Sequence, residues 1–113
     1  MSVNQKIKNA VQPIVPECVP GDYSGDKQEY CTFNYSEIPT LYSDDAPTFI
    51  RYLIQLHWFS PIRSNPIAKK KKLKSAIASA DFTYPKVTDA SDNLCNHLVF
   101  EFEYVEQLNE LNI

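Results

Sequence analysis

The sequence predicts one α+β domain, an antiparallel β-sheet with about two helices packed on one of its faces. Two segments place apolar residues at helical spacing, residues 3–11 and 67–80. Three segments rich in aromatic and β-branched residues alternate with a period of two, residues 29–35, 48–59 and 98–104. The chain has 113 residues, 43% of them hydrophobic, which is enough for one core and too few for two. We therefore expect residues 1–113 to form a single domain.

The first expected element is a helix within residues 1–15. Its apolar side chains share one stripe at helical spacing, namely Val3, Ile7, Ala10 and Val11. Pro13 ends the helix, because proline lacks the backbone N–H and clashes with the preceding turn. Turn-forming residues follow closely: Pro16, Pro20, Gly21 and Gly25. We expect an ordered irregular loop over residues 16–28.

Two strands and a second loop come next. The alternation over residues 29–35 favours a strand, and Pro39 and Pro47 then predict a loop over residues 36–47. Residues 48–59 give the strongest strand pattern of the chain, with large apolar residues on one face: Ile50, Tyr52, Ile54, Leu56 and Trp58. At about 3.3 Å per residue this strand is about 40 Å long, so we expect it to project beyond the sheet.

A second helix is expected to begin at Asn65 and Pro66. The asparagine side chain can accept a free backbone N–H, and proline at the first helical position loses no hydrogen bond. The helix ends near Ala80, and its apolar stripe is Ile67, Leu73, Ala76, Ile77 and Ala80.

The last third of the chain predicts two more strands. Phe82 and Tyr84 indicate a short strand, and a polar turn follows at residues 89–93. The last strand alternates buried and solvent-facing positions, and its expected buried face is Leu98, Phe100, Phe102 and Tyr104. Residues 105–113 are weakly patterned, and we expect a flexible tail there.

Composition excludes several classes of protein. The net charge is -3 and the pI is about 5.3, which argues against a protein that binds duplex nucleic acid along its whole surface. Two glycines supply neither a phosphate-binding loop nor a dinucleotide fingerprint. No apolar run approaches the roughly 18 residues of a membrane span and no export signal is recognisable, so we expect a soluble protein with no membrane partner. Three cysteines without Cys-x-x-Cys spacing predict free thiols in a reducing compartment.

Three small groups hold residue types that serve in catalysis or metal binding. His57 and His97 both face outward from expected strands, and their rings can meet if the strands are neighbours, but no third metal ligand stands at a suitable spacing. Cys95 lies on the same side as His97, yet nothing activates its thiol. Asp44 and Asp45 are explained by capping of the local loop backbone. We therefore assign no catalytic residue, no metal ligand and no cofactor, and expect no enzyme.

Positive charge is concentrated in the second expected helix. Six basic residues and no acid lie between Arg63 and Ala80, whereas residues 81–113 carry seven acids against Lys86 alone. The simplest interpretation is a helix face exposed to solvent. A functional interpretation is a contact between basic and acidic regions, either with an identical neighbour or with another protein. Binding of the nucleic-acid backbone is a third possibility. Several aromatic residues also lie in or beside the expected loops, where large amphipathic rings often anchor a protein–protein interface. The candidate interface residues are Tyr23, Tyr42, Asp44, Asp45, Arg63, Lys69, Lys70, Lys71, Lys72 and Lys74.

Five short motifs follow one another in a recognisable order. They are Gly-Asp-Lys-Gln-Glu-Tyr-Cys-Thr-Phe-Asn-Tyr (25–35), Leu-Tyr-Ser-Asp-Asp-Ala-Pro (41–47), Ile-Gln-Leu-His-Trp-Phe (54–59), Ala-Asp-Phe-Thr (80–83) after the lysine-rich helix, and His-Leu-Val-Phe-Glu-Phe-Glu (97–103). This succession, over residues 16 to 104, resembles the small tail-completion or tail-terminator proteins of long-tailed bacteriophages. Asp81 departs from the family, whose turn usually has glycine; aspartate tolerates left-handed geometry better than most residues.

The resemblance implies a virion structural protein without catalytic residues. Such proteins form a ring, commonly of six identical subunits, at the head-proximal end of the tail. The ring ends polymerisation of the tail tube protein and joins the tail to the head connector or stopper protein, and genome DNA passes through its lumen. The resemblance also implies a location in the tail or neck of the virion, and in the host cytoplasm during assembly.

Two alternatives stay open from the sequence. The nearest is a head-side connector or stopper protein of the neck, which differs in the part of the particle it binds. The other is a small binding module that recognises an acidic protein or nucleic acid through Lys69–Lys72 and Lys74.

Overall fold

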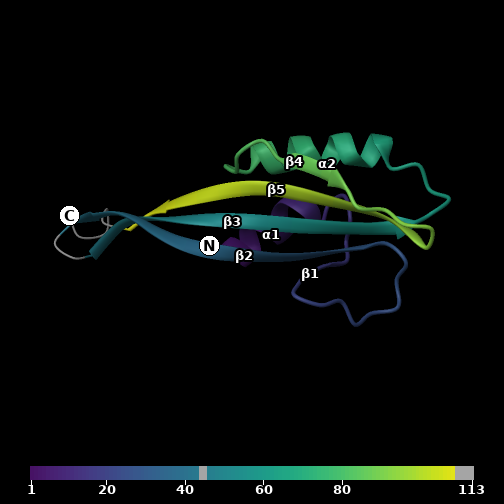
Figure 1. The fold of residues 1–113 in the computed structure, drawn as a ribbon, viewed down its shortest axis with the longest axis horizontal. Helices are drawn as coiled ribbons and strands as arrows, with labels where there is room; N and C mark the ends of the chain where they lie inside the picture. The colour runs from purple at the N-terminus through teal and green to yellow at the C-terminus, as the bar shows by residue number, and fades with distance from the viewer. Residues whose placement is uncertain (44–45, 109–113) are drawn as a thin grey trace.

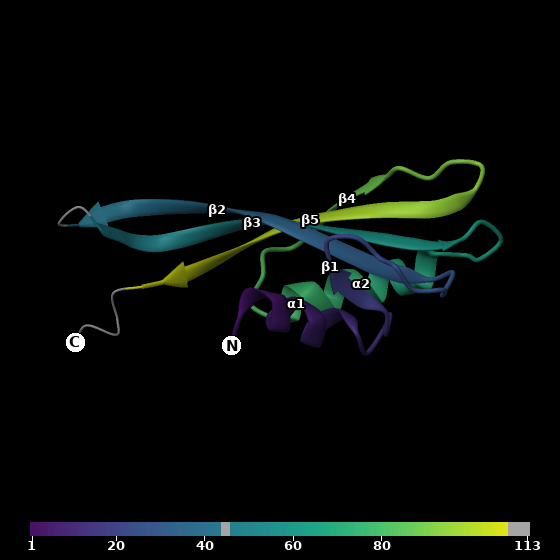
Figure 2. The same cartoon turned by 90° about the horizontal axis from the view of Figure 1, so that it is seen from below.

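A computed structural model describes residues 1–43 and 46–108 of the chain. Its elements are α1 (Val3–Val11), β1 (Cys18–Pro20), β2 (Tyr30–Ser43), β3 (Ala46–Pro61), α2 (Ile67–Ser79), β4 (Lys86–Asp89) and β5 (Cys95–Gln107). The strands form one sheet in the order β1-β2-β3-β5-β4, and both helices lie on the same face of it (Figure 1, Figure 2). The α+β class is confirmed. The sheet is mixed, because β1 runs parallel to β2 while the other neighbours are antiparallel.

The core lies between the sheet and the helix layer. Leu56 in the middle of β3 pairs with Phe33 on one side and Phe100 on the other, and all three side chains are buried. Ile7 of α1 and Leu73 of α2 cover this row from the helix layer and are also fully buried. Each such side chain contributes about 1.5–3 kcal/mol through burial of its apolar surface. The period-two faces that the sequence predicted for β3 and β5 are therefore confirmed.

Both helices form where the spacing predicted them. The Ser2 hydroxyl accepts a hydrogen bond from the Gln5 backbone N–H at 3.1 Å and caps α1. Asn65 accepts from the Ile67 N–H at 3.0 Å as expected, but Pro66 occupies the cap position and α2 begins at Ile67, not at the proline. Ile67 itself is 56% exposed and does not join the buried stripe as expected. Asp81 follows α2 with φ at 68°, so it takes the left-handed conformation that glycine adopts most easily.

The expected loop over residues 36–47 was wrong. β2 continues to Ser43 and β3 begins at Ala46, because the antiparallel pairing extends from Tyr30 opposite Phe59 to Ser43 opposite Ala46. Pro39 is tolerated because β2 is an edge strand at this point: β1 pairs with it only from Cys31 to Phe33.

The long hairpin carries the sheet beyond the helices (Figure 2). We call this extension the arm: residues 37–43 of β2, 46–52 of β3 and 104–107 of β5. The molecule measures 54 × 26 × 22 Å, and its radius of gyration is 15.7 Å, against about 13 Å for a compact chain of this size. β3 was expected to project beyond the sheet, but it stays paired with β2 as far as Ala46 and with β5 as far as Phe49, so the sheet itself extends beyond the helices.

Three smaller expectations were also wrong. The predicted loop over residues 16–28 contains β1, a three-residue strand held by the backbone of β2. The short strand expected at Phe82 and Tyr84 lies instead at β4, because the Phe82 ring is buried against Phe102 and Tyr104. A flexible tail was expected from residue 105, but β5 pairs with β3 as far as Gln107, and residues 109–113 lie outside the described part of the chain.

Candidate interaction surfaces

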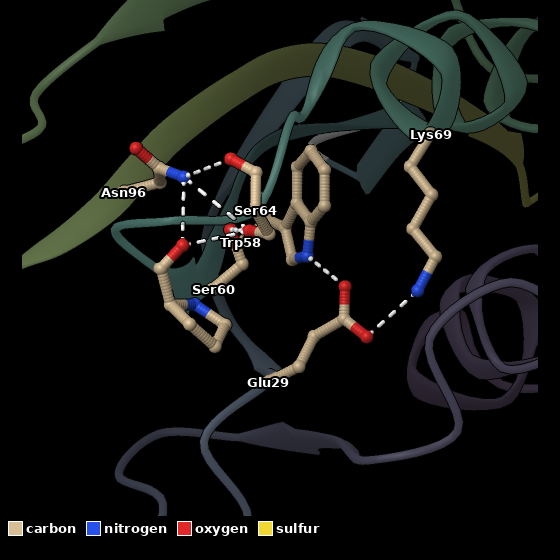
Figure 3. Close-up of polar contacts among 7 residues, drawn as sticks. Glu29, Trp58, Ser60, Ser64, Lys69 and Asn96 are labelled. Carbon is tan, nitrogen blue, oxygen red and sulfur yellow. Dashed lines mark hydrogen bonds and ion pairs between the residues drawn. The ribbon is translucent and has the colours of Figure 1, made fainter.

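A carboxylate fixes the lysine-rich helix to the sheet (Figure 3). One oxygen of Glu29 accepts a hydrogen bond from the Trp58 indole N–H at 3.1 Å, and its other oxygen pairs with the Lys69 ammonium at 2.7 Å. Trp58 is 2% exposed, so its N–H needs a partner within the protein. Lys69, a candidate interface residue, thus has an internal partner and serves to orient α2.

A second polar network fixes the segment between β3 and α2 (Figure 3). The Asn96 amide donates to the backbone carbonyls of Pro61 and Ser64, at 3.0 and 3.1 Å. The Ser64 hydroxyl donates to the Pro61 carbonyl at 2.7 Å and to the buried Ser60 hydroxyl at 3.3 Å. These bonds tie the start of α2 to β5 and fix the direction in which the helix presents its lysines.

The remaining lysines of α2 differ in their surroundings. The Lys74 ammonium lies 5.5 Å from the centre of the Tyr84 ring, a cation–π contact. Lys70 is half-buried, whereas Lys71 and Lys72 are exposed. Within the described part of the chain, Lys70, Lys71 and Lys72 form no ion pair. We call Lys70, Lys71 and Lys72 the lysine surface. It is the part of the predicted basic helix that remains available to a partner.

The open face of the sheet carries a row of stacked rings, the aromatic row: Tyr23, Tyr30, Phe59, His97 and His57. Successive ring centres from Tyr23 to Tyr30, Phe59 and His97 lie 4.2, 4.9 and 4.2 Å apart, with each pair near parallel. The rings come from the 21–29 segment and from three neighbouring strands. Because the rings stack on one another, their flat faces are largely occupied, and the row is poorly suited to stack nucleic-acid bases.

The two histidines meet at the end of the aromatic row, as the sequence predicted for neighbouring strands. Nδ1 of His57 and Nε2 of His97 lie 2.8 Å apart, so one nitrogen donates a proton and the other accepts it. Burial lowers the pKa of both imidazoles; His97 adds to the effect on His57, while Asp92 and Asp89 oppose it at His97. The pair is therefore held in its neutral form near pH 7.

A hollow of about 430 Å³ adjoins the aromatic row. Arg63 lines it together with Tyr30, Phe59 and Cys95, and the exposed side chains of Ile62 and Leu94 form its rim. Tyr23 and Arg63, both candidate interface residues, thus lie near the open face, while the candidate lysines lie on α2 in the helix layer. The structure divides the predicted interface into two surfaces.

The other candidates have simpler positions. Tyr42 lies in β2 opposite Pro47, at the far end of the arm, and Asp44 and Asp45 lie outside the described residues. Cys18 and Cys31 are free and buried, and burial raises the pKa of both thiols, that of Cys18 to about 12. Within residues 1–43 and 46–108, no three His, Cys, Asp or Glu side chains are grouped to hold a metal ion. No helix in those same ranges is long and apolar enough to cross a membrane.

Sequence reasoning missed the partners of Glu29 and the aromatic row. In the sequence Glu29 is an ordinary acidic residue beside a strand. Its sequence neighbours do not indicate that Trp58 and Lys69 both contact its carboxylate. The aromatic row could not be predicted from the sequence, because its members come from four separate segments. The outward alternation of Phe59 and His57 was the one available signal.

Neither protein-family models nor curated protein sequences give a match to this chain.

Proposed function

We propose that this chain is a virion structural protein, a tail-terminator or tail-completion ring that ends the tail tube at its head-proximal end and joins it to the head. The order of the five motifs carries the proposal. In the fold these motifs lie on the start of β2, the end of the arm, β3, the turn after α2, and β5. The family resemblance thus rests on segments from the whole sheet and from the end of one helix.

Two physical features support a role in assembly. The arm extends beyond the helices, so most of its length lacks the cover that the rest of the sheet has on one side (Figure 2). Such a surface is commonly buried by another chain. The lysine surface and the acids of β5 also place opposite charges on different parts of one subunit, which favours head-to-tail contact between copies.

The test is disruption of the gene in its phage. We expect intact heads together with unattached or overlong tails, seen by electron microscopy. Purified protein should form oligomers of about six by native mass spectrometry and should stop growth of purified tube protein. Tails of normal length joined to full heads in the absence of the protein would reject the proposal.

The same purified protein separates the nearest alternative. A head-side connector or stopper binds the head portal complex and leaves the length of tube polymers unchanged. A binding module for an acidic partner stays monomeric and folded and loses its ligand when the α2 lysines are reversed in charge.

A further inference from the structure

The underside of the arm, on the side where the helices lie, is acidic and aromatic. Two cross-strand rows form it: Glu37, Tyr52 and Tyr104, then Pro39, Ile50 and Glu106. We call these six residues the arm underside. The helix layer reaches only its near border, where the Tyr35 hydroxyl donates to Asn4 of α1 at 2.7 Å and the Lys6 ammonium lies 4.8 Å from the Tyr104 ring centre.

The two carboxylates of the arm underside both lie near Tyr52, and within the described residues neither forms an ion pair. Glu106 accepts a hydrogen bond from the Tyr52 hydroxyl at 3.1 Å. Burial, Glu106 and Glu37 together raise the pKa of Tyr52 to about 12, so both acids act on the same phenol. Within the described residues, no lysine or arginine forms an ion pair with Glu37 or Glu106. Two negative charges beside tyrosine rings favour a basic partner.

The lysine surface has the opposite charge and a suitable size. α2 has 13 residues, a length of about 20 Å, and can therefore cross the three strands of the arm, which together are about 10 Å wide. Lys71 and Lys72 are exposed on that helix, and the networks at Glu29 and Asn96 fix its orientation. Each copy therefore carries both a basic helix and an acidic arm surface that such a helix can cross.

We propose that the arm underside of one copy binds the lysine surface of α2 in the next copy. The inference rests on the proposed ring and identifies its subunit contact. The two surfaces differ, so the contact is heterologous, and its repetition about an axis closes a ring. Lys71 and Lys72 lie opposite Glu37 and Glu106 in this contact.

The experiment uses two charge variants of the full chain. One is Lys71→Glu with Lys72→Glu; the other is Glu37→Lys with Glu106→Gln, in which glutamine still accepts the Tyr52 hydrogen bond. Each variant alone should weaken self-association about tenfold or more, measured by sedimentation and native mass spectrometry. An equimolar mixture should recover association, because the acidic helix meets the basic arm and the basic helix meets the acidic arm. A single chain that carries all four substitutions should also recover self-association.

Matched controls change the same charges elsewhere. Lys27→Glu with Lys86→Glu, and Asp26→Lys with Asp22→Asn, lie outside both surfaces and should leave association unchanged. Unaltered circular dichroism and unfolding midpoints show that each variant folds.

The outcomes separate this contact from the ring itself. Wild-type rings that stop tube growth, with both variants assembling equally well, would overturn the contact and leave the proposed function standing. Loss of association in the lysine variant alone would also overturn it and would indicate another partner for α2, such as nucleic acid. A wild-type chain that stays monomeric and does not affect tubes would reject the proposed function as well.

Discussion

His57 of β3 and His97 of β5 share one hydrogen bond, Nδ1 to Nε2 at 2.8 Å, on the open face of the sheet. The bond exists only while at least one of these nitrogens lacks a proton, because two protonated rings are both donors and repel each other. The aromatic row is therefore most ordered when the pair is neutral.

Stability should fall as the pH is lowered from 7 to 5. The pKa of each histidine is lowered in the folded chain, so below about 6.5 the unfolded chain binds more protons than the folded one, and acid favours unfolding. Thermal unfolding followed by circular dichroism should give a lower midpoint at pH 5. His97→Gln should flatten this dependence between pH 5 and 7. Identical pH profiles for wild type and variant would contradict the assignment to this pair.

Loss of the Glu29 carboxylate should loosen α2. Glu29→Ala leaves the buried Trp58 N–H without its acceptor and should cost about 1–3 kcal/mol in the free energy of unfolding, measured by urea titration. Glu29→Gln retains an acceptor for the indole and loses mainly the ion pair with Lys69, which is partly exposed and contributes less. The glutamine variant should therefore be the more stable of the two. The reverse order would show that the charge, and not the indole bond, dominates.

The turn after α2 should prefer glycine. Asp81 has φ at 68°, and its ion pair with Lys6 is long, 4.0 Å, and exposed on the aspartate side. Asp81→Gly should leave stability unchanged or raise it by up to about 1 kcal/mol, whereas Asp81→Val should lower it by about 1–2 kcal/mol. The urea midpoint of the glycine variant should therefore lie above that of the valine variant, and a valine variant as stable as the wild type would argue against the left-handed turn.

The three cysteines should react at very different rates. Cys18 and Cys31 are 1% and 0% exposed and have raised pKa values, so little thiolate is present or accessible at pH 7.5. Cys95 is only half-buried and borders the hollow beside the aromatic row. Mass spectrometry after brief maleimide treatment should find one label on the folded protein and three in urea. Rapid labelling of Cys18 without denaturant would show that β1 opens readily.

Local patterns were enough for the elements whose burial repeats along their own segment. Leu73 and Ile77 mark the inner side of α2, and the alternation from Ile50 to Trp58 marks the inner side of β3; both were predicted and are found. The hydrogen bond to the Asn65 side chain and the tolerance of Asp81 for a left-handed turn were also readable, because both involve only backbone within a few residues.

The sequence alone therefore determined one α+β core, both helices, the long central strand and the concentration of lysine on α2. Only the tertiary structure decided the extent of β2, the existence of β1 and the site of β4, because strand pairing is made with backbone from distant parts of the chain. It also decided that Lys69 turns inward to Glu29 while Lys71 and Lys72 stay exposed. Neighbouring lysines look alike in a sequence, and each one's role depends on which strand lies beneath it.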